Sequence, residues 1–83
     1  MNSKHQKTLN KLMERPVLAN IKFNDVDKLL VAMGFQRIER EGSRVCFKKE
    51  EDEIVLHKPH PRNELLKYIV RDLQMFIKHT GDK

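Results

Sequence analysis

The sequence predicts a two-layer α+β domain, with two helices packed on one face of a three-stranded antiparallel sheet. Three observations carry this prediction. Residues 24–33 and 64–79 each repeat apolar side chains at helical spacing, and residues 42–61 alternate as a β-hairpin does. Because the hairpin is local, the helices can pack only around it. A further helix over residues 3–14 is expected before this unit.

Composition limits the classes of protein that fit. With 83 residues the chain fits one domain, divided here into an N-terminal helical extension (1–16) and the domain proper (17–83). At 39% apolar and 35% charged residues, a disordered chain is not expected. The single cysteine and the lack of an apolar leader or membrane span favour the cytoplasm and no membrane partner. The net charge of +5 favours an anionic partner, either nucleic acid or acidic protein.

The N-terminal helix is predicted to begin at its cap, Ser3, and to end before Pro16. Its narrow apolar edge is formed by Leu9, Leu12 and Met13, with Lys4, Lys7 and Lys11 on the other side. An extension docked loosely on the domain is the favoured interpretation, and a basic arm near RNA is the alternative. Residues 17–23 are expected to be a connector with some strand character.

The next helix is expected to start at Asn24, a good N-cap, and to place its apolar side chains in the core. These side chains are Val26, Leu29, Leu30 and Met33. Gly34 fits the position after the helix, and Phe35 can pack back on the apolar face. Residues 35–41 then form a weak edge strand, and the turn at 42–43 leads into the hairpin.

Alternation in the hairpin strands, 44–49 and 54–58, sends Val45, Phe47, Ile54 and Leu56 inward and Arg44, Cys46, Lys48, Val55 and His57 outward. Two registers keep apolar residues opposite each other. A turn at 51–52 puts Cys46 opposite His57, whereas a turn at 50–51 puts Arg44 opposite His57. Cross-strand neighbours lie about 5 Å apart and diagonal ones about 7 Å. Both registers therefore bring Arg44 and His57 together on the outer face.

Beyond the hairpin, Pro59 and Pro61 hold His60 in an extended loop. Asn63 is the expected N-cap of the last helix, residues 64–79. That helix carries a wide apolar stripe, formed by Leu65, Leu66, Ile69, Val70, Leu73, Phe76 and Ile77.

The sequence contains no phosphate-binding loop, zinc-ligand spacing or helical HExxH, so neither a metal nor a cofactor is expected. A Cys46–His57 nucleophile is a minor alternative, open only in the first register. RNA cleavage needs no nucleophile from the protein, because the 2′-hydroxyl of RNA is itself the nucleophile. A base, an acid and a cation for the phosphate suffice, and His57, Arg44 and His60 offer such groups. Candidate phosphate contacts are Ser43, Arg44, Lys48, Lys58 and Arg62.

Two short motifs carry a resemblance to a known family. Gly42-Ser43-Arg44-Val45 and His57-Lys58-Pro59-His60-Pro61, with the closing helix, resemble the HicA toxins of bacterial HicAB toxin–antitoxin systems over about residues 24–80. The resemblance implies a fold like that of double-stranded-RNA-binding domains. It further implies a metal-independent mRNA endonuclease that inhibits translation and growth, and a HicB-like antitoxin that masks its active surface.

The chain departs from the better-known pattern of this family at one position. The residue after Gly-Ser is there the catalytic histidine, but here it is Arg44. We hypothesise that His57 takes over as general base or acid, that Arg44 binds phosphate and that His60 assists. A non-catalytic RNA-binding module of the same fold, and a domain that binds only acidic protein, are the competing hypotheses.

Overall fold

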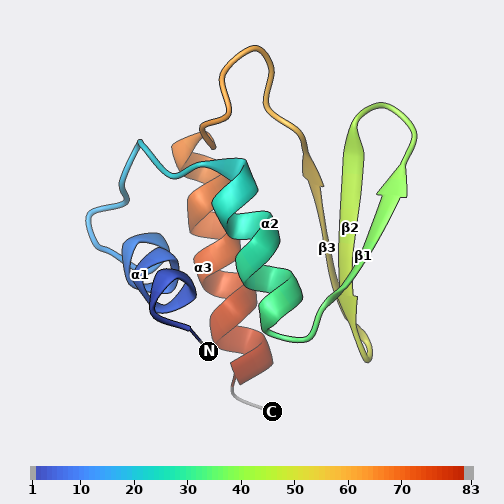
Figure 1. The fold of residues 1–83 in the computed structure, drawn as a ribbon, viewed down its shortest axis with the longest axis horizontal. Coiled ribbons are helices and arrows are strands. Elements are labelled where there is room, and N and C mark those ends of the chain that lie inside the picture. The colour runs from blue at the N-terminus through green and yellow to red at the C-terminus, as the bar shows by residue number, and fades with distance from the viewer. Residues whose placement is uncertain (1, 82–83) are drawn as a thin grey trace.

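The computed structural model describes residues 2–81, which form three helices and one three-stranded sheet. The elements are α1 (Ser3–Leu12), α2 (Phe23–Ala32), β1 (Gln36–Arg40), β2 (Arg44–Lys49), β3 (Asp52–His57) and α3 (Lys67–Gly81). The strands are antiparallel in the order β1-β2-β3, and the helices lie on one side of the sheet (Figure 1). The predicted α+β class, with an extra N-terminal helix, is confirmed.

The core lies between the helices and the inward face of the sheet. Each layer contributes several fully buried side chains, which are Leu12 of α1, Val26, Leu29 and Leu30 of α2, Val45 and Phe47 of β2, and Val70 and Leu73 of α3. The α1 helix is tied to α3 by Gln74, whose side-chain amide donates to the backbone carbonyls of Leu12 at 2.8 Å and Glu14 at 3.0 Å. The extension therefore contributes to the core, while the domain boundary at residue 16 stays a prediction.

The N-caps of two helices differ from prediction, by one residue in α1 and by two in α2. The N-cap of α1 is Asn2 instead of Ser3, because the Asn2 carboxamide oxygen accepts the His5 backbone N–H at 2.9 Å. The α2 helix begins at Phe23, and its N-cap residue Lys22 makes no side-chain capping bond. Asn24 therefore lies inside the first turn of α2.

The end of α2 is as predicted. Gly34 has a φ of 99°, a conformation that suits a residue without Cβ. The Gly34 N–H donates to the carbonyl of Val31 and the Phe35 N–H to that of Leu30, both at 3.0 Å, which is the Schellman pattern. Phe35 is buried, with its ring centroid 5.5 Å from that of Phe76 in α3. This turn therefore fixes the angle at which the chain enters β1.

The start of α3 is the largest departure from the predicted elements. The helix begins at Lys67, not residue 64 after an Asn63 cap. Residues 63–65 pair instead with residues 21–23, through bonds from the Phe23 N–H to the Asn63 carbonyl (2.7 Å) and from the Leu65 N–H to the Ile21 carbonyl (2.8 Å). The strand character expected of the connector is thus realised as one short bridge.

The hairpin adopts the second of the two predicted registers. Arg44 lies opposite His57 and Val45 opposite Leu56, so the two-residue turn is at 50–51, with a φ of 57° at Glu50. The first register, with Cys46 opposite His57, is wrong, since Cys46 lies opposite Val55. No helix within residues 2–81 is long and apolar enough to cross a membrane.

Candidate nucleic-acid interface

A row of basic residues crosses the outer face of the sheet. Arg44 in the central strand is the Cα partner of Arg40 on one side and of His57 on the other. Val45 and Leu56 are buried toward the helices, so alternation sends these three side chains to the opposite, open face. All three are exposed. The sheet thus holds two guanidinium groups and an imidazole in one line.

The turn that precedes Arg44 is anchored on both sides. Gly42 and Ser43 have φ values of 72° and 61°, and the Ser43 carbonyl accepts the Lys58 N–H at 2.8 Å. The Arg44 Nε donates to the carbonyl of Glu41 at 2.9 Å. Within residues 2–81, the terminal guanidinium nitrogens of Arg44 make no further hydrogen bond. Arg44 is therefore positioned by one nitrogen, which leaves two for a ligand.

The two candidate catalytic histidines lie close in sequence at one end of the sheet. His57 ends β3, and His60 follows in the exposed loop that leads to α3 (Figure 1). Neither imidazole forms a hydrogen bond or ion pair with any residue that the structure describes. Both rings are thus accessible to an incoming phosphodiester, and no side chain within residues 2–81 orients either ring through a hydrogen bond.

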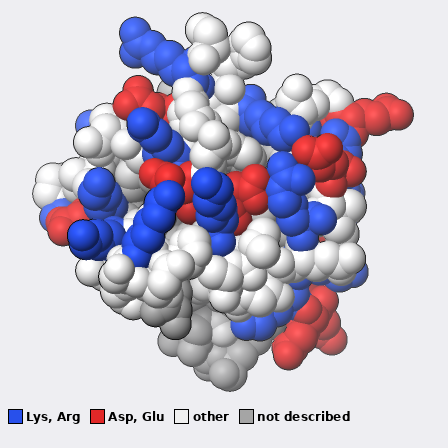
Figure 2. All heavy atoms as spheres, viewed as in Figure 1, with Lys and Arg blue, Asp and Glu red and all other residues white. Residues whose placement is uncertain are grey.

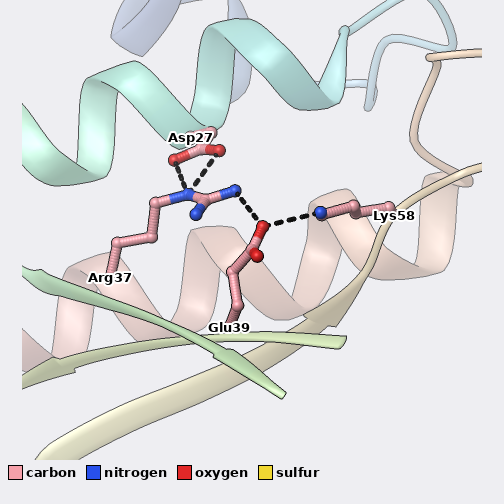
Figure 3. Close-up of polar contacts among 4 residues, drawn as sticks. All are labelled: Asp27, Arg37, Glu39 and Lys58. Carbon is pink, nitrogen blue, oxygen red and sulfur yellow. Dashed lines mark hydrogen bonds and ion pairs between the residues drawn. The ribbon is translucent and has the colours of Figure 1, made fainter. Parts of the chain in front are cut away.

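The predicted phosphate contacts divide into two groups. Ser43, Lys48 and Arg62 are exposed, as is Arg44. Lys58 instead belongs to a chain of ion pairs that runs Asp27–Arg37–Glu39–Lys58 and links α2, β1 and the segment after β3 (Figure 3). Its ammonium group lies 2.7 Å from a Glu39 carboxylate oxygen, so a phosphate would have to compete for it.

The same chain of ion pairs alters the pKa of two members. The Lys58 hydrogen bond, with that of Arg37, holds the pKa of Glu39 below its usual value. The Asp27 carboxylate, which accepts from the Arg37 Nε at 2.9 and 3.0 Å, raises the pKa of Arg37. Both shifts favour the charged forms, so Arg37 and Glu39 are both charged near neutral pH.

Cys46 lies on the open face but is covered by its surroundings. It is fully buried between its cross-strand partners Ile38 and Val55. Its Sγ lies 3.4 Å from a Glu53 carboxylate oxygen. Burial, and next the hydrogen bond to Glu53, raise the pKa of the Cys46 thiol. An uncharged, covered thiol opposite valine does not fit the alternative of a Cys46–His57 nucleophile.

A second basic region was only partly foreseen from the sequence. A hollow between α1 and the segment around Ile21 is lined by Lys4, Lys7, Lys11 and Lys22, together with Asp25 and Glu64. Basic side chains are spread across the face that includes α1 and α2 and reach the sheet side, with acidic ones between them (Figure 2). The lysine spacing in α1 was visible in the sequence, but the approach of Lys22 depends on the tertiary bridge from residue 22 to residue 64.

Comparison with known families now places this fold. The family model described as "HicA toxin of bacterial toxin-antitoxin" matches residues 23–81, which include α2, the whole sheet and α3. The chain therefore belongs to the HicA toxin family, and is the toxin of a toxin–antitoxin system. Membership implies a cognate antitoxin as its partner. Neither a curated protein nor a solved structure matches the chain.

Proposed function

We propose that this protein is an endoribonuclease that cleaves mRNA without a metal ion and thereby stops translation and growth. The observation that carries the proposal is the direct cross-strand pairing of Arg44 with His57 on the open face. This pairing sets a phosphate-binding cation beside a group suited to proton transfer. Membership of the HicA toxin family supports the same class of activity.

In the proposed reaction, the terminal nitrogens of Arg44 bind the non-bridging oxygens of one phosphodiester. His57 accepts the proton of the adjacent 2′-hydroxyl, whose oxygen then attacks phosphorus. The bond from phosphorus to the 5′-oxygen breaks, and an acid returns a proton to that oxygen. His60 is the candidate acid. The products are a 2′,3′-cyclic phosphate and a 5′-hydroxyl, so atoms and charge balance without water or metal.

Lys48, Arg62 and the Ser43 hydroxyl are the candidate contacts for neighbouring phosphates, which is supported by their exposure on the same sheet, turn and loop. The lysine-lined hollow beside α1 offers a further contact for a longer RNA. Such contacts contribute affinity that is independent of sequence and weakens as salt rises. The antitoxin, as a competitor for this basic face, would need an acidic surface.

The test compares growth and mRNA integrity after induction of the wild type, His57→Ala and the control His79→Ala. His79 is also an exposed histidine, 3.7 Å from Asp52 at the opposite end of β3 from His57. We expect arrest and degraded mRNA with the wild type and His79→Ala, but not with His57→Ala at equal soluble protein. Full toxicity of His57→Ala would contradict the assignment of His57 and direct attention to His60.

A purified reaction then tests the chemistry. An RNA whose scissile nucleotide carries a 2′-O-methyl group should resist cleavage, because the nucleophile is blocked, and a chelator should leave the cleavage rate unchanged.

Arg44 stands where the family resemblance expects the catalytic histidine, which favours one alternative, a non-catalytic RNA-binding module. That alternative predicts salt-sensitive RNA binding with intact RNA and with harmless expression of the wild type.

A further inference from the structure

The strand β3 has one side of its backbone without a partner strand. It forms an edge of the sheet, and its only ladder within residues 2–81 is with β2. The Lys58 N–H points to the Ser43 carbonyl, just before β2. Because the backbone groups of successive residues point to opposite sides of a strand, the N–H and C=O groups of Glu53, Val55 and His57 point away from β2, toward the open edge of the sheet. These groups are open to pairing with another strand.

The side chains along this edge are complementary to a second copy of the same strand. β3 runs from an acidic start, Asp52 and Glu53, through apolar residues to His57 and then Lys58. If two copies pair antiparallel about Val55, Glu53 of each copy lies opposite His57 of the other, and the two Val55 residues face each other. Opposed residues must share a face of the sheet, and these pairs do.

The same register uses the outward backbone groups. Pairing about Val55 places residues whose backbone groups point away from β2 opposite each other in the two copies. This allows about six backbone hydrogen bonds across the two-fold axis. Pairing about Ile54 or Leu56 would still form about four such bonds, but it would place Val55 opposite Glu53 or opposite His57 and so leave the charged residues without their partners. The register about Val55 forms the most backbone hydrogen bonds and is the one that pairs Glu53 with His57, so both the number of bonds and the charge pattern favour it.

The surroundings of the edge fit an interface. Val55 is 40% exposed and Tyr68 in α3 is 60% exposed, both high for such side chains. These two residues, with His57 and Asp72, line a hollow between β3 and α3. By contrast, the other edge strand, β1, carries Arg37 and Glu39 in the chain of ion pairs, and charged edges discourage pairing.

We propose that this protein forms a two-fold symmetric homodimer through β3, which joins two sheets into one of six strands and places Glu53 of each copy beside His57 of the other. The proposal does not depend on ribonuclease activity, because it rests on the edge alone. Both open faces remain on the same side of the joined sheet. The occupant is a second copy because one strand supplies both halves of each charge pair.

Sedimentation of the purified full chain from about 5 to 500 µM tests the assembly, a range that separates weak from stable pairs. We expect a dimer for the wild type and for Val31→Lys, but a monomer for Val55→Lys, which opposes two ammonium groups at the axis. Val31 is the matched control, since it is 48% exposed on α2. A wild type that stays monomeric at 500 µM overturns the proposal, even if it captures an extended antitoxin segment at this edge.

Cross-linking and charge exchange test the register and do not depend on the folding of Val55→Lys. A short bismaleimide should join two copies of Val55→Cys but not of Val31→Cys, while buried Cys46 stays unmodified. His57→Glu should weaken dimerisation about tenfold by opposing Glu53, and adding Glu53→Lys should restore it. Equal cross-linking of the two cysteine variants, or no rescue by the double variant, overturns the register.

Discussion

One buried amide helps to link α1 to the rest of the protein, beside the core contacts of Leu12. Gln74 is 2% exposed, and its Nε2 donates to two carbonyls at the end of α1, those of Leu12 and Glu14. The last carbonyls of a helix have no partner within it, so Gln74 satisfies the buried carbonyl of Leu12 at the end of α1 and also the part-buried carbonyl of Glu14 just beyond the helix. The substitution Gln74→Leu keeps the volume approximately but removes both donors.

The expected cost follows from the number of hydrogen bonds lost. A net hydrogen bond contributes about 0.5–1.5 kcal/mol, so two give about 1–3 kcal/mol, and the stranded carbonyls place the result in the upper half of that range. A loss of about 2 kcal/mol lowers the Tm of a domain this size by roughly 8–16 °C.

The assay is urea unfolding followed by far-UV circular dichroism, with Gln36→Leu as the control on the exposed surface of β1. The control should change the free energy of unfolding by less than about 0.5 kcal/mol. An unchanged urea slope would show that the effect lies in stability and not in the size of the cooperative unit. The reasoning is refuted if Gln74→Leu is as stable as the wild type, because the two hydrogen bonds would then contribute nothing.

Three further outcomes follow from the structure. Iodoacetamide should modify Cys46 slowly in the native protein and rapidly in urea, because the thiol is buried and its pKa is raised; equal rates would contradict this. Gly34→Ala should lose about 1–2 kcal/mol in urea unfolding, since φ is 99° there while a Cβ would meet only Lys49 at 3.6 Å; an unchanged midpoint would count against backbone strain. The pKa of Glu39 is lowered on folding, so its contribution to stability is present above its unfolded pKa and is lost as pH falls through the folded one. Unfolding curves of the wild type and Glu39→Gln from pH 7 to 3 should therefore converge under acid, and a constant difference would contradict the shift.

Local patterns in the sequence were sufficient for most of the fold. The helical stripes, the Gly34 turn and the inward alternation of Val45 and Leu56 all depend on neighbours a few residues away, and the structure reproduces them. The start of α3 could not be predicted in this way. Residues 63–65 looked free to begin a helix, but their backbone groups bond to residues 21–23, about forty positions earlier.

The sequence predicted which residues of the candidate site lie near each other, but not which are direct cross-strand partners. The alternation of side chains placed Arg44 and His57 on one face of the sheet. Two alternative hairpin turns, at 51–52 and at 50–51, both kept apolar residues opposite each other, and the sequence alone did not choose between these turns. The structure selects the register that makes them direct partners. The burial of Cys46 was missed because it depends on Ile38 from another strand, and the role of Lys58 because it depends on Glu39.

The chain of ion pairs between α2 and Lys58 has a consequence for the electric field of the protein. Its two acidic and two basic members sum to zero charge, so the net charge of +5 is carried by the rest of the chain. The protein thus presents an uneven potential, with a neutralised edge at β1 and positive surfaces on the open face and beside α1. Anionic molecules that come within the Debye length, about 10 Å at 0.1 M salt, are attracted to the positive surfaces and are oriented toward them before contact. The orientation of an arriving partner is then set partly at a distance, and dilute buffers would raise both its association rate and its affinity.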